Sequence, residues 1–400
     1  MKNGWEIRTL GDIAEVKGGK RVPKGYQLRY EPTDHPYITV SDFTDDGTID
    51  TSELGYVSEE VFEKIKRYTI SSKDLYLSIA GTIGKTGYVP AELDGANLTE
   101  NACKLVLHPG TNRDFLYYFT RSADFAEQAG ANTRTAAQPK LALERLKTIR
   151  LCVPPLAEQQ RIVGLLDVAF AGIATAKANA EKNLQNARAL FESHLQSVFT
   201  QRGKGWKEKT LEEIATTFGR GKSRHRPRNE PKLYGGKYPF VQTGDIRNAH
   251  HIITEYSQTY SEAGLAQSKL WPKGTICITI AANIAETAIL GFDACFPDSV
   301  IGVVANPNEA EVGFIEYLLQ SFKARIQALG KGSAQANINM GTFENERFPF
   351  PPVSEQKQIV AKLDALSEET QRLASLYKRK LVAVATLQKS LLHQAFTGEL

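Results

Sequence analysis

Pro154-Pro155-Leu156-Ala157-Glu158-Gln159-Gln160-Arg161-Ile162-Val163 returns later in the chain as Pro351-Pro352-Val353-Ser354-Glu355-Gln356-Lys357-Gln358-Ile359-Val360. A proline pair suits an extended approach followed by the first turn of a helix. After the first pair no proline appears until Pro227, and after the second pair none appears at all. Each pair therefore predicts the start of one long helix.

Apolar residues recur at spacings of three and four in both proline-free segments, a pattern typical of a coiled coil. At 1.5 Å per residue, about 45 residues span roughly 65 Å, too far for one small globule to cover. We therefore favour two helices that pack on each other over two helices that each lie on their own globule. The connectivity makes such a pair antiparallel. The apolar positions are Ile162, Leu166, Ala169, Ile173, Ala176, Ala180, Leu184, Ala187, Phe191, Leu195 and Val198, then Ile359, Leu363, Leu366, Leu373, Tyr377, Leu381, Val384, Leu387 and Leu392.

The repeat extends over the whole chain. The pattern Gly-Trp-x-x-x-Thr-Leu-x-x-Ile-Ala begins at Gly4 and again at Gly205, and residues 77–84 are echoed by residues 278–285. The offset falls from 201 at the tryptophans to 197 at the proline pairs, so the second copy is slightly shorter. This order of matches predicts two related halves with a pseudo-two-fold relation.

Each half opens with a segment that mixes β-like runs, Gly-rich turns and short helices. The expected strands are 37–40, 74–79, 102–107, 275–280 and 299–304. The predicted fold class is α+β: two mixed α/β domains, here called the first and second head, separated by two long antiparallel helices that form an intramolecular coiled coil. The predicted boundaries are 1–153 for the first head, 154–200 for the first helical spacer, 201–350 for the second head and 351–400 for the second spacer.

Composition indicates a globular protein without a membrane segment. The 400 residues are 42% hydrophobic and 24% charged, and the N-terminus lacks the apolar stretch of a secretory signal. The sequence holds no run of about 18 apolar residues, so we expect no membrane span. The four cysteines are far apart and form no C-x-x-C pair, which favours a cytoplasmic location and neither a zinc site nor a disulfide framework.

Two clusters of cations predict contact with nucleic acid. The net charge is only +4, so this case depends on local clusters. Residues 219–228, the second cationic loop, hold five cations in ten residues, and residues 17–24, the first cationic loop, hold four at the same place in the repeat. Flexible cationic loops suit phosphate contacts, and arginine can also read guanine edges. The alternative is a solvated surface loop. The candidates are Lys20, Arg21, Lys24, Arg220, Lys222, Arg224, Arg226 and Arg228.

Two further regions are weaker candidates for DNA contact. Short polar stretches at 132–138 and 331–337 occupy matching places and carry amides and cations that suit base edges, although an ordinary polar connection explains them nearly as well. The turn at 78–85 offers a threonine and a lysine, and its counterpart departs from it because Ala282-Asn283 and Ala285-Glu286 replace Gly81-Thr82 and Gly84-Lys85. These candidates are Thr82, Lys85, Arg134, Gln138, Lys331, Ser333 and Gln335.

The double P-P-[LV]-x-E-Q-x-x-I-V, the turn at 78–85 and the ending Gln394 to Leu400 together resemble the specificity subunit of type I restriction–modification systems, over essentially the whole chain. The resemblance implies two target-recognition domains that each read one half of a split, asymmetric sequence in double-stranded DNA. It also implies that the helices set the gap and dock two adenine-N6 methyltransferase subunits, which bring restriction subunits with them.

In that family the specificity subunit itself is not an enzyme and needs no cofactor. Its partners bind S-adenosylmethionine, ATP and Mg²⁺. We assign the start of each helix to the methyltransferase contact, since capping explains the glutamates but not the repeated glutamines. The assigned residues are Pro155, Glu158, Gln159, Pro352, Glu355 and Gln356.

Signatures of an independent enzyme are lacking in the sequence. Gly84-Lys85-Thr86 and Gly221-Lys222-Ser223 resemble the end of a P-loop, but Ile79 and Thr216 stand where its first glycine belongs. No H-E-x-x-H metal motif exists, and no Asp, Asn or Ser precedes either proline pair as an amino-methyltransferase requires. Two alternatives stay open: a stand-alone DNA-modifying enzyme, and a coiled-coil adaptor that does not bind DNA.

Overall fold

The computed structural model describes residues 4–131, 140–225, 227–281, 283–330, 338, 340–344 and 346–400. The chain divides into two compact units: residues 1–181 with 378–400, and residues 182–377. Each unit holds one head together with a segment of both long helices, α6 (Leu156–Thr200) and α12 (Val353–Thr397). Two mixed α/β domains with long helices between them are the predicted fold class, which is confirmed. The four predicted domain boundaries stay a prediction.

The first head contains three sheets. An antiparallel sheet has the order β2-β8-β5-β6, a smaller one has the order β4-β3-β7, and β1 pairs with β9. The strands are β1 (Glu6–Thr9), β2 (Ala14–Gly18), β3 (Pro36–Ile38), β4 (Gly55–Tyr56), β5 (Leu75–Ser78), β6 (Thr86–Tyr88), β7 (Asn97–Leu98), β8 (Ala102–Leu107) and β9 (Arg150–Val153). The helices are α1 (Leu10–Ile13), η1 (Val40–Asp42), α2 (Glu59–Ile65), η2 (Ala91–Leu93), α3 (Arg113–Thr120), α4 (Ala123–Ala131) and α5 (Leu143–Lys147).

The second head repeats this plan with two extra short strands, β13 and β15. Its sheets have the orders β11-β19-β16-β17-β13, β14-β12-β18-β15 and β10-β20. The strands are β10 (Lys207–Lys209), β11 (Ala215–Arg220), β12 (Tyr234–Phe240), β13 (Ile252–Ile253), β14 (Gln258–Tyr260), β15 (Leu270–Trp271), β16 (Ile276–Thr279), β17 (Thr287–Leu290), β18 (Ala294–Cys295), β19 (Val300–Ala305) and β20 (Phe348–Phe350). The helices are η3 (Pro231–Leu233), α7 (Thr243–Asn248), α8 (Glu262–Ala266), α9 (Val312–Ser321), α10 (Lys323–Gly330) and α11 (Met340–Glu344).

The five strands expected from the sequence correspond to β3, β5, β8, β16 and β19. Within the larger sheets, β2, β8, β5 and β6 of the first head take the places of β11, β19, β16 and β17 in the second, with the same antiparallel pairings. The duplication in the sequence is therefore a duplication of topology.

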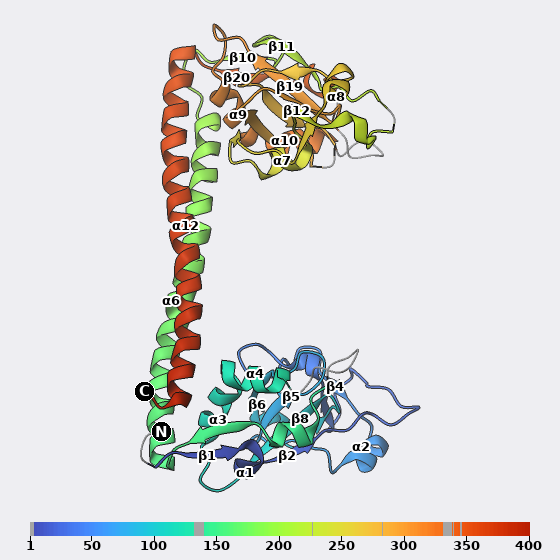
Figure 1. Ribbon diagram of the computed structural model, residues 1–400, viewed down its shortest axis with the longest axis vertical. Helices are drawn as coiled ribbons and strands as arrows, with labels where there is room; N and C mark the ends of the chain where they lie inside the picture. Colours follow the sequence, from blue (N-terminus) through green and yellow to red (C-terminus); the bar gives the residue numbers. More distant parts are fainter. Residues whose placement is uncertain are drawn as a thin grey trace. The chain divides into compact units, whose positions relative to one another are not determined.

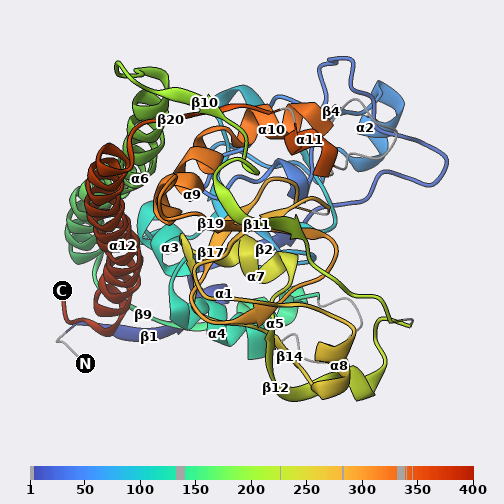
Figure 2. The same ribbon diagram turned by 90° about the horizontal axis from the view of Figure 1, so that it is seen from above.

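In each unit a segment of α6 lies alongside a segment of α12, coloured green and red (Figure 1, Figure 2). In the first unit, Ile162 and Leu166 near the start of α6 share a core with Leu392 and Phe396 near the end of α12. In the second unit, Leu195 near the end of α6 shares a core with Leu363 near the start of α12. The pairing is antiparallel within each unit, as the connectivity requires.

Burial on α6 follows a seven-residue spacing through Leu166, Ile173, Ala180 and Ala187, as a coiled-coil seam requires. Ala176 and Leu387, which we also expected in the seam, are exposed instead. A strict heptad selects a narrower face than the full set of three-and-four spacings, and this explains the difference.

The helix α6 is long and apolar enough to cross a membrane, by length and composition only. We expected no such helix from the sequence, because α6 contains no uninterrupted run of about 18 apolar residues. A core helix of a soluble protein passes the same test. The two ends of α6 contribute to the cores of the two units, through Ile162, Val163 and Leu166 in the first and Leu195 and Phe199 in the second, although only 17% of the apolar window is buried.

Candidate nucleic-acid interface

Each cationic loop leaves its sheet where a glycine passes close to another part of the backbone. A Cβ on Gly19 would lie 2.1 Å from the carbonyl oxygen of Thr99, and one on Gly221 would lie 2.3 Å from that of Phe296. No side chain fits in so short a gap, so glycine is required at both places. Both loops therefore begin at the same structural position, next to the segment that enters β8 or β19.

The first cationic loop carries its cations on the surface. Arg21 is 78% exposed, and its Nε donates to Oε1 of Glu100 at 2.5 Å. The ammonium of Lys20 lies 5.7 Å from the ring centroid of Tyr68, and Lys24 is exposed. The pKa of Glu100 lies below its ordinary value. Partial burial raises this pKa, but the hydrogen bonds that the carboxylate accepts, from Arg21 above all, together lower it by more.

The backbone of the second cationic loop is fixed by side chains from the rest of the head. Ser268 Oγ donates to the carbonyl of Lys222 at 2.8 Å, the His225 amide donates to Gln267 Oε1 at 3.0 Å, and Tyr234 Oη donates to the carbonyl of Arg228 at 2.6 Å. A loop held at three points keeps its side chains in a defined arrangement.

The cations of this loop fall into two groups. Arg220 Nε donates to the carbonyl of Asp298 at 2.8 Å, and Arg228 Nη2 donates to both carboxylate oxygens of Asp298 at 2.8 and 2.7 Å. Lys222 and Arg224 are exposed, and within the described part of the chain neither side chain has an ion-pair partner. Among its four described cations, the loop therefore presents two without an ion-pair partner, Lys222 and Arg224, and two that Asp298 holds.

The turn at 78–85 and its counterpart at 279–286 are built alike, although their sequences differ. Lys85 N donates to the hydroxyl of buried Ser78 at 2.8 Å, and Glu286 N donates to that of buried Thr279 at 3.0 Å. Gly84 has a φ of +95°, and Ala285 in its place has a φ of +62°. The sequence change in the second head thus preserves the turn, and it leaves Ala285 with a positive φ, in the left-handed region of backbone conformation.

The lysine of this turn is engaged within the first head. Lys85 Nζ forms an ion pair with Asp45 Oδ1 at 2.9 Å and donates to the carbonyl of Phe43 at 3.1 Å, whereas Thr82 is exposed. A DNA contact by Lys85 would have to replace both interactions. Six other candidates lie outside the described residues: Arg134, Gln138, Arg226, Lys331, Ser333 and Gln335.

The repeated glutamines at the helix starts are buried clamps between head and helix. Gln159 is 1% exposed and Gln356 is 0% exposed. Gln159 Oε1 accepts from Asn112 N at 2.8 Å, and its Nε2 donates to the carbonyls of Gly110 and Pro154 at 3.1 and 2.9 Å. In this fold the side chain is fully engaged inside the chain.

Gln356 makes the same three bonds in the second unit: it accepts from Glu311 N at 2.8 Å and donates to the carbonyls of Glu309 and Pro351 at 3.2 and 2.8 Å. The repetition of these glutamines thus has a reason in the fold, which sequence reasoning missed. Of the six residues assigned to a methyltransferase, Pro155 and Pro352 are exposed and Glu158 and Glu355 are half-buried, so these four remain available at the surface.

A second repeated tie joins each head to its helix. Tyr118 Oη donates to Asp167 Oδ1 at 2.5 Å, and Tyr317 Oη donates to Asp364 Oδ1 at 2.7 Å. Burial and the adjacent carboxylate raise the pKa of both phenols, so both stay protonated donors at neutral pH. The sequence signal for this tie is the Leu-Asp pair that follows each glutamine motif, Leu166-Asp167 in the first half and Leu363-Asp364 in the second.

The second head also holds a histidine paired with a fully buried glutamate. His251 Nδ1 lies 2.6 Å from Oε2 of fully buried Glu316, and Thr287 Oγ1 donates to Oε1 of Glu316 at 2.9 Å. Burial lowers the pKa of His251, but the hydrogen bond and charge of Glu316 outweigh it, so the net pKa is above its ordinary value. Tyr117 takes the place of Glu316 in the first head.

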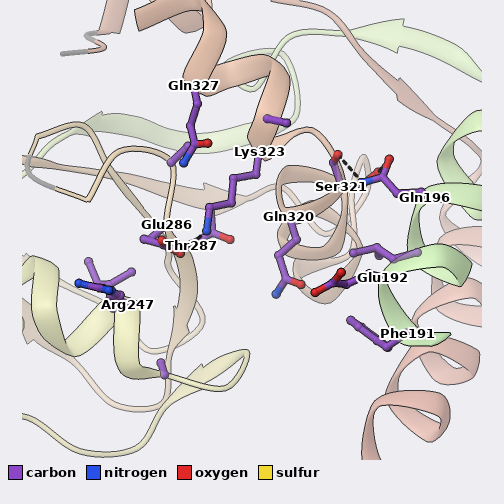
Figure 3. A pocket seen from close by; sticks show the side chains of 15 residues that line it. Phe191, Glu192, Gln196, Arg247, Glu286, Thr287, Gln320, Ser321, Lys323 and Gln327 are labelled. Carbon is purple, nitrogen blue, oxygen red and sulfur yellow. Dashed lines mark hydrogen bonds and ion pairs between the residues drawn. The ribbon is translucent and has the colours of Figure 1, made fainter. Parts of the chain in front are cut away.

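A recess of about 590 Å³ opens between the end of α6 and the second head (Figure 3). Gln196 Nε2 donates to the carbonyl of Ser321 at 2.8 Å on one side, and Lys323 pairs with Glu286 at 2.7 Å on the other. Its described lining contains no histidine or cysteine. The recess lies at the junction of helix and head.

Further candidates for reactive groups are two of the cysteines and the residue types that bind metals. Burial raises the pKa of Cys103 and Cys277, which keeps both thiols protonated and poor nucleophiles. In the residues with defined positions, no three His, Cys, Asp or Glu side chains gather closely enough to hold a metal ion.

Comparison with known proteins gives a consistent family. A family model described as "Type I restriction modification DNA specificity domain" matches residues 2–185 and 203–378, once in each half. The putative type I restriction enzyme MjaX specificity subunit of Methanocaldococcus jannaschii is 24% identical over 99% of this chain and 93% of its own length. The EcoKI specificity subunit of Escherichia coli is 21% identical over 100% of this chain and 90% of its own length.

Solved structures agree on the fold. The HsdS subunit from Thermoanaerobacter tengcongensis superposes with a TM-score of 0.66 at 19% identity, covering 100% of this chain and 98% of that one. A chain from a study of complex assembly and conformational transition of the type I R-M system superposes with a TM-score of 0.81 at 19% identity, covering 100% and 99%. With two copies of the family domain and a topology shared with these structures, the chain belongs to the family of type I restriction–modification DNA specificity subunits.

Proposed function

We propose that this chain is the non-catalytic reader of a type I restriction–modification complex and that each head reads one half of a split, asymmetric target in double-stranded DNA. The observation that carries the proposal is the pair of cationic loops. Each leaves its sheet through a glycine at the same structural position, and each is next to an acidic residue that holds one of its arginines. Duplicated heads with duplicated loops fit a target made of two half-sites.

Within this proposal the cations have two tasks. Exposed lysines and unpaired Arg224 contact phosphates, since a solvated cation gains most from the field of the DNA backbone. Arginines held by a carboxylate keep a fixed plane and suit base edges. The same division applies to Lys20 and Lys24 against Arg21 in the first head.

We further propose that α6 and α12 set the gap between half-sites and dock two adenine methyltransferase subunits. Exposed apolar side chains on both helices support docking, because large apolar residues in water are typical of a surface that a partner covers. They are Leu165, Val168, Leu190, Val382 and Leu387. The helix starts with Pro155, Glu158, Pro352 and Glu355 belong to the same proposed contact.

The chemistry of the complex then belongs to the partners. S-adenosylmethionine would be bound by the methyltransferase subunits, and ATP and Mg²⁺ by the restriction subunits that join through them. This chain would contribute binding and orientation in the cytoplasm, without a cofactor of its own.

Two experiments test the proposal. Co-expression with a type I methyltransferase subunit, followed by genome-wide mapping of methylated adenine, should yield one split motif with a fixed gap. DNA binding by the assembled complex should weaken steeply with salt, because each neutralised phosphate releases counterions. Methylation or cleavage by the purified chain alone would favour an independent enzyme, and binding to a partner without any salt-sensitive DNA affinity would favour an adaptor.

A further inference from the structure

An acidic residue precedes the strand next to each cationic loop. Glu100 lies two positions before β8, and Asp298 lies two positions before β19. These strands take the same place in the two heads, so the two acids are structurally equivalent. Each pairs with an arginine from the loop, Glu100 with Arg21 and Asp298 with Arg228.

Stability does not account for these two pairs. Arg21 is 78% exposed and Arg228 is 49% exposed, and ion pairs between exposed side chains contribute little to stability. A carboxylate in a phosphate-binding loop also weakens the attraction between that loop and DNA. An acid at the same structural position in both heads pairs with an arginine of the cationic loop, although the two arginines stand at different places in their loops. This recurrence indicates a task other than stability or simple attraction.

The geometry of the pairs suits orientation of the arginine. A guanidinium is planar with five donors, so a carboxylate that holds one side of it fixes the plane of the rest. Arg228 gives only Nη2 to Asp298, and Arg21 gives only Nε to Glu100, so both keep further donors facing away from the acid. Guanine offers two acceptors, O6 and N7, that match arginine donors in the major groove.

The surroundings of Arg228 strengthen this reading. It lines an open polar recess of about 340 Å³ together with Gln242 and Gln258, whose amides hydrogen-bond to each other at 2.8 Å. Arg220 also donates to the backbone carbonyl of Asp298, so Asp298 holds two arginines of the loop. Base edges entering such a recess would meet an oriented arginine next to amide groups.

We propose that Arg21 and Arg228 each read a guanine, one in each half-site, and that Glu100 and Asp298 are the positioning residues that orient them. This inference rests on the proposed function, because it assumes that each head reads one half-site. It adds a residue-level rule: the two acids determine specificity without adding affinity.

The test uses the complete complex with its methyltransferase subunits, carrying Asp298→Asn in one version and Glu100→Gln in another. Both changes keep the shape of the side chain and remove its charge. Discrimination at one guanine position should fall by roughly 5- to 150-fold in the half-site read by the altered head, while the other half-site stays unchanged. Affinity for unrelated DNA should stay equal or increase, because one negative charge has been removed from the loop.

A purely structural role would give a different pattern, with a lower melting temperature and weaker binding to all DNA. Glu262→Gln is the matched control, since it removes an exposed carboxylate from the pair with Lys237 elsewhere in the second head; it should leave both half-sites intact. Asp298→Glu, which restores the charge, should retain more discrimination than Asp298→Asn.

The possible outcomes distinguish failure of the proposed function from failure of the inference about Glu100 and Asp298. A wild-type complex that methylates without a split motif would overturn the proposed function itself. A normal wild-type motif that Asp298→Asn and Glu100→Gln leave unchanged, relax in both halves at once, or relax only at bases other than guanine would overturn this inference alone.

Discussion

Replacement of Gln356 by alanine tests whether the repeated glutamine belongs to the fold or to a partner. The side chain is fully buried and makes three hydrogen bonds. It accepts from the backbone amide of Glu311, the N-cap residue of α9, and donates to the carbonyls of Glu309 and Pro351. Each bond contributes about 1 kcal/mol net, and buried groups left without a partner cost more. The structure therefore predicts a loss of about 3 kcal/mol in the free energy of unfolding of the second unit.

Urea unfolding of the isolated chain measures this loss. Trp206 packs against the same core and donates to Glu355 at 3.0 Å, so its fluorescence reports on this junction once Trp5 and Trp271 are replaced by phenylalanine in both the reference and the variant chain. Gln358→Ala is the matched control, because Gln358 lies two positions away on the same helix and is exposed. If both variants were equally stable while Gln356→Ala alone failed to assemble with a methyltransferase subunit, the clamp would be refuted and the partner contact favoured.

Three further predictions concern the turn, the buried histidine and the second cationic loop. Gly84→Ala should destabilise the first head by about 1 kcal/mol because alanine is strained at a φ of +95°, whereas Ala285→Gly should not destabilise the second; equal losses in thermal melting would contradict this. His251→Asn, which tolerates the positive φ, should cost more stability at pH 6 than at pH 9. The raised pKa of His251 means that its stabilisation is complete below about 6.5 and is lost as the pH rises through the folded pKa; a difference independent of pH would count against it. Replacement of Lys222 and Arg224 by alanine should weaken DNA binding by the complex and reduce the slope of log K against log salt by up to about 2, and an unchanged slope in a salt titration would remove the loop from the interface.

Much of the architecture could be predicted from the sequence because it is written twice. The proline pairs located the start of both 45-residue helices, and the runs around Asp74 and Thr275 located central strands. Such features depend on local chemistry and periodicity.

The contacts within the site were harder to foresee because they join residues far apart in the chain. Glu100 lies 79 positions from Arg21, and Asp298 lies 70 positions from Arg228. Nothing local marks either acid, and only the equivalence of β8 and β19 reveals that they occupy one structural position. The hydrogen bonds of the repeated glutamines were hard to foresee for a related reason: a polar residue in a helical turn looks like surface until its hydrogen-bond partners in the head are known.

The proposed function requires that the two heads read separate half-sites at a gap set by the helices. Deletion of four residues from α6 and four from α12 at matching positions, which removes about 6 Å from each helix, tests this claim directly when methylated adenines are mapped for the resulting complex. The account predicts the same two half-sites at an altered gap. Half-sites of changed sequence at the original gap would contradict it.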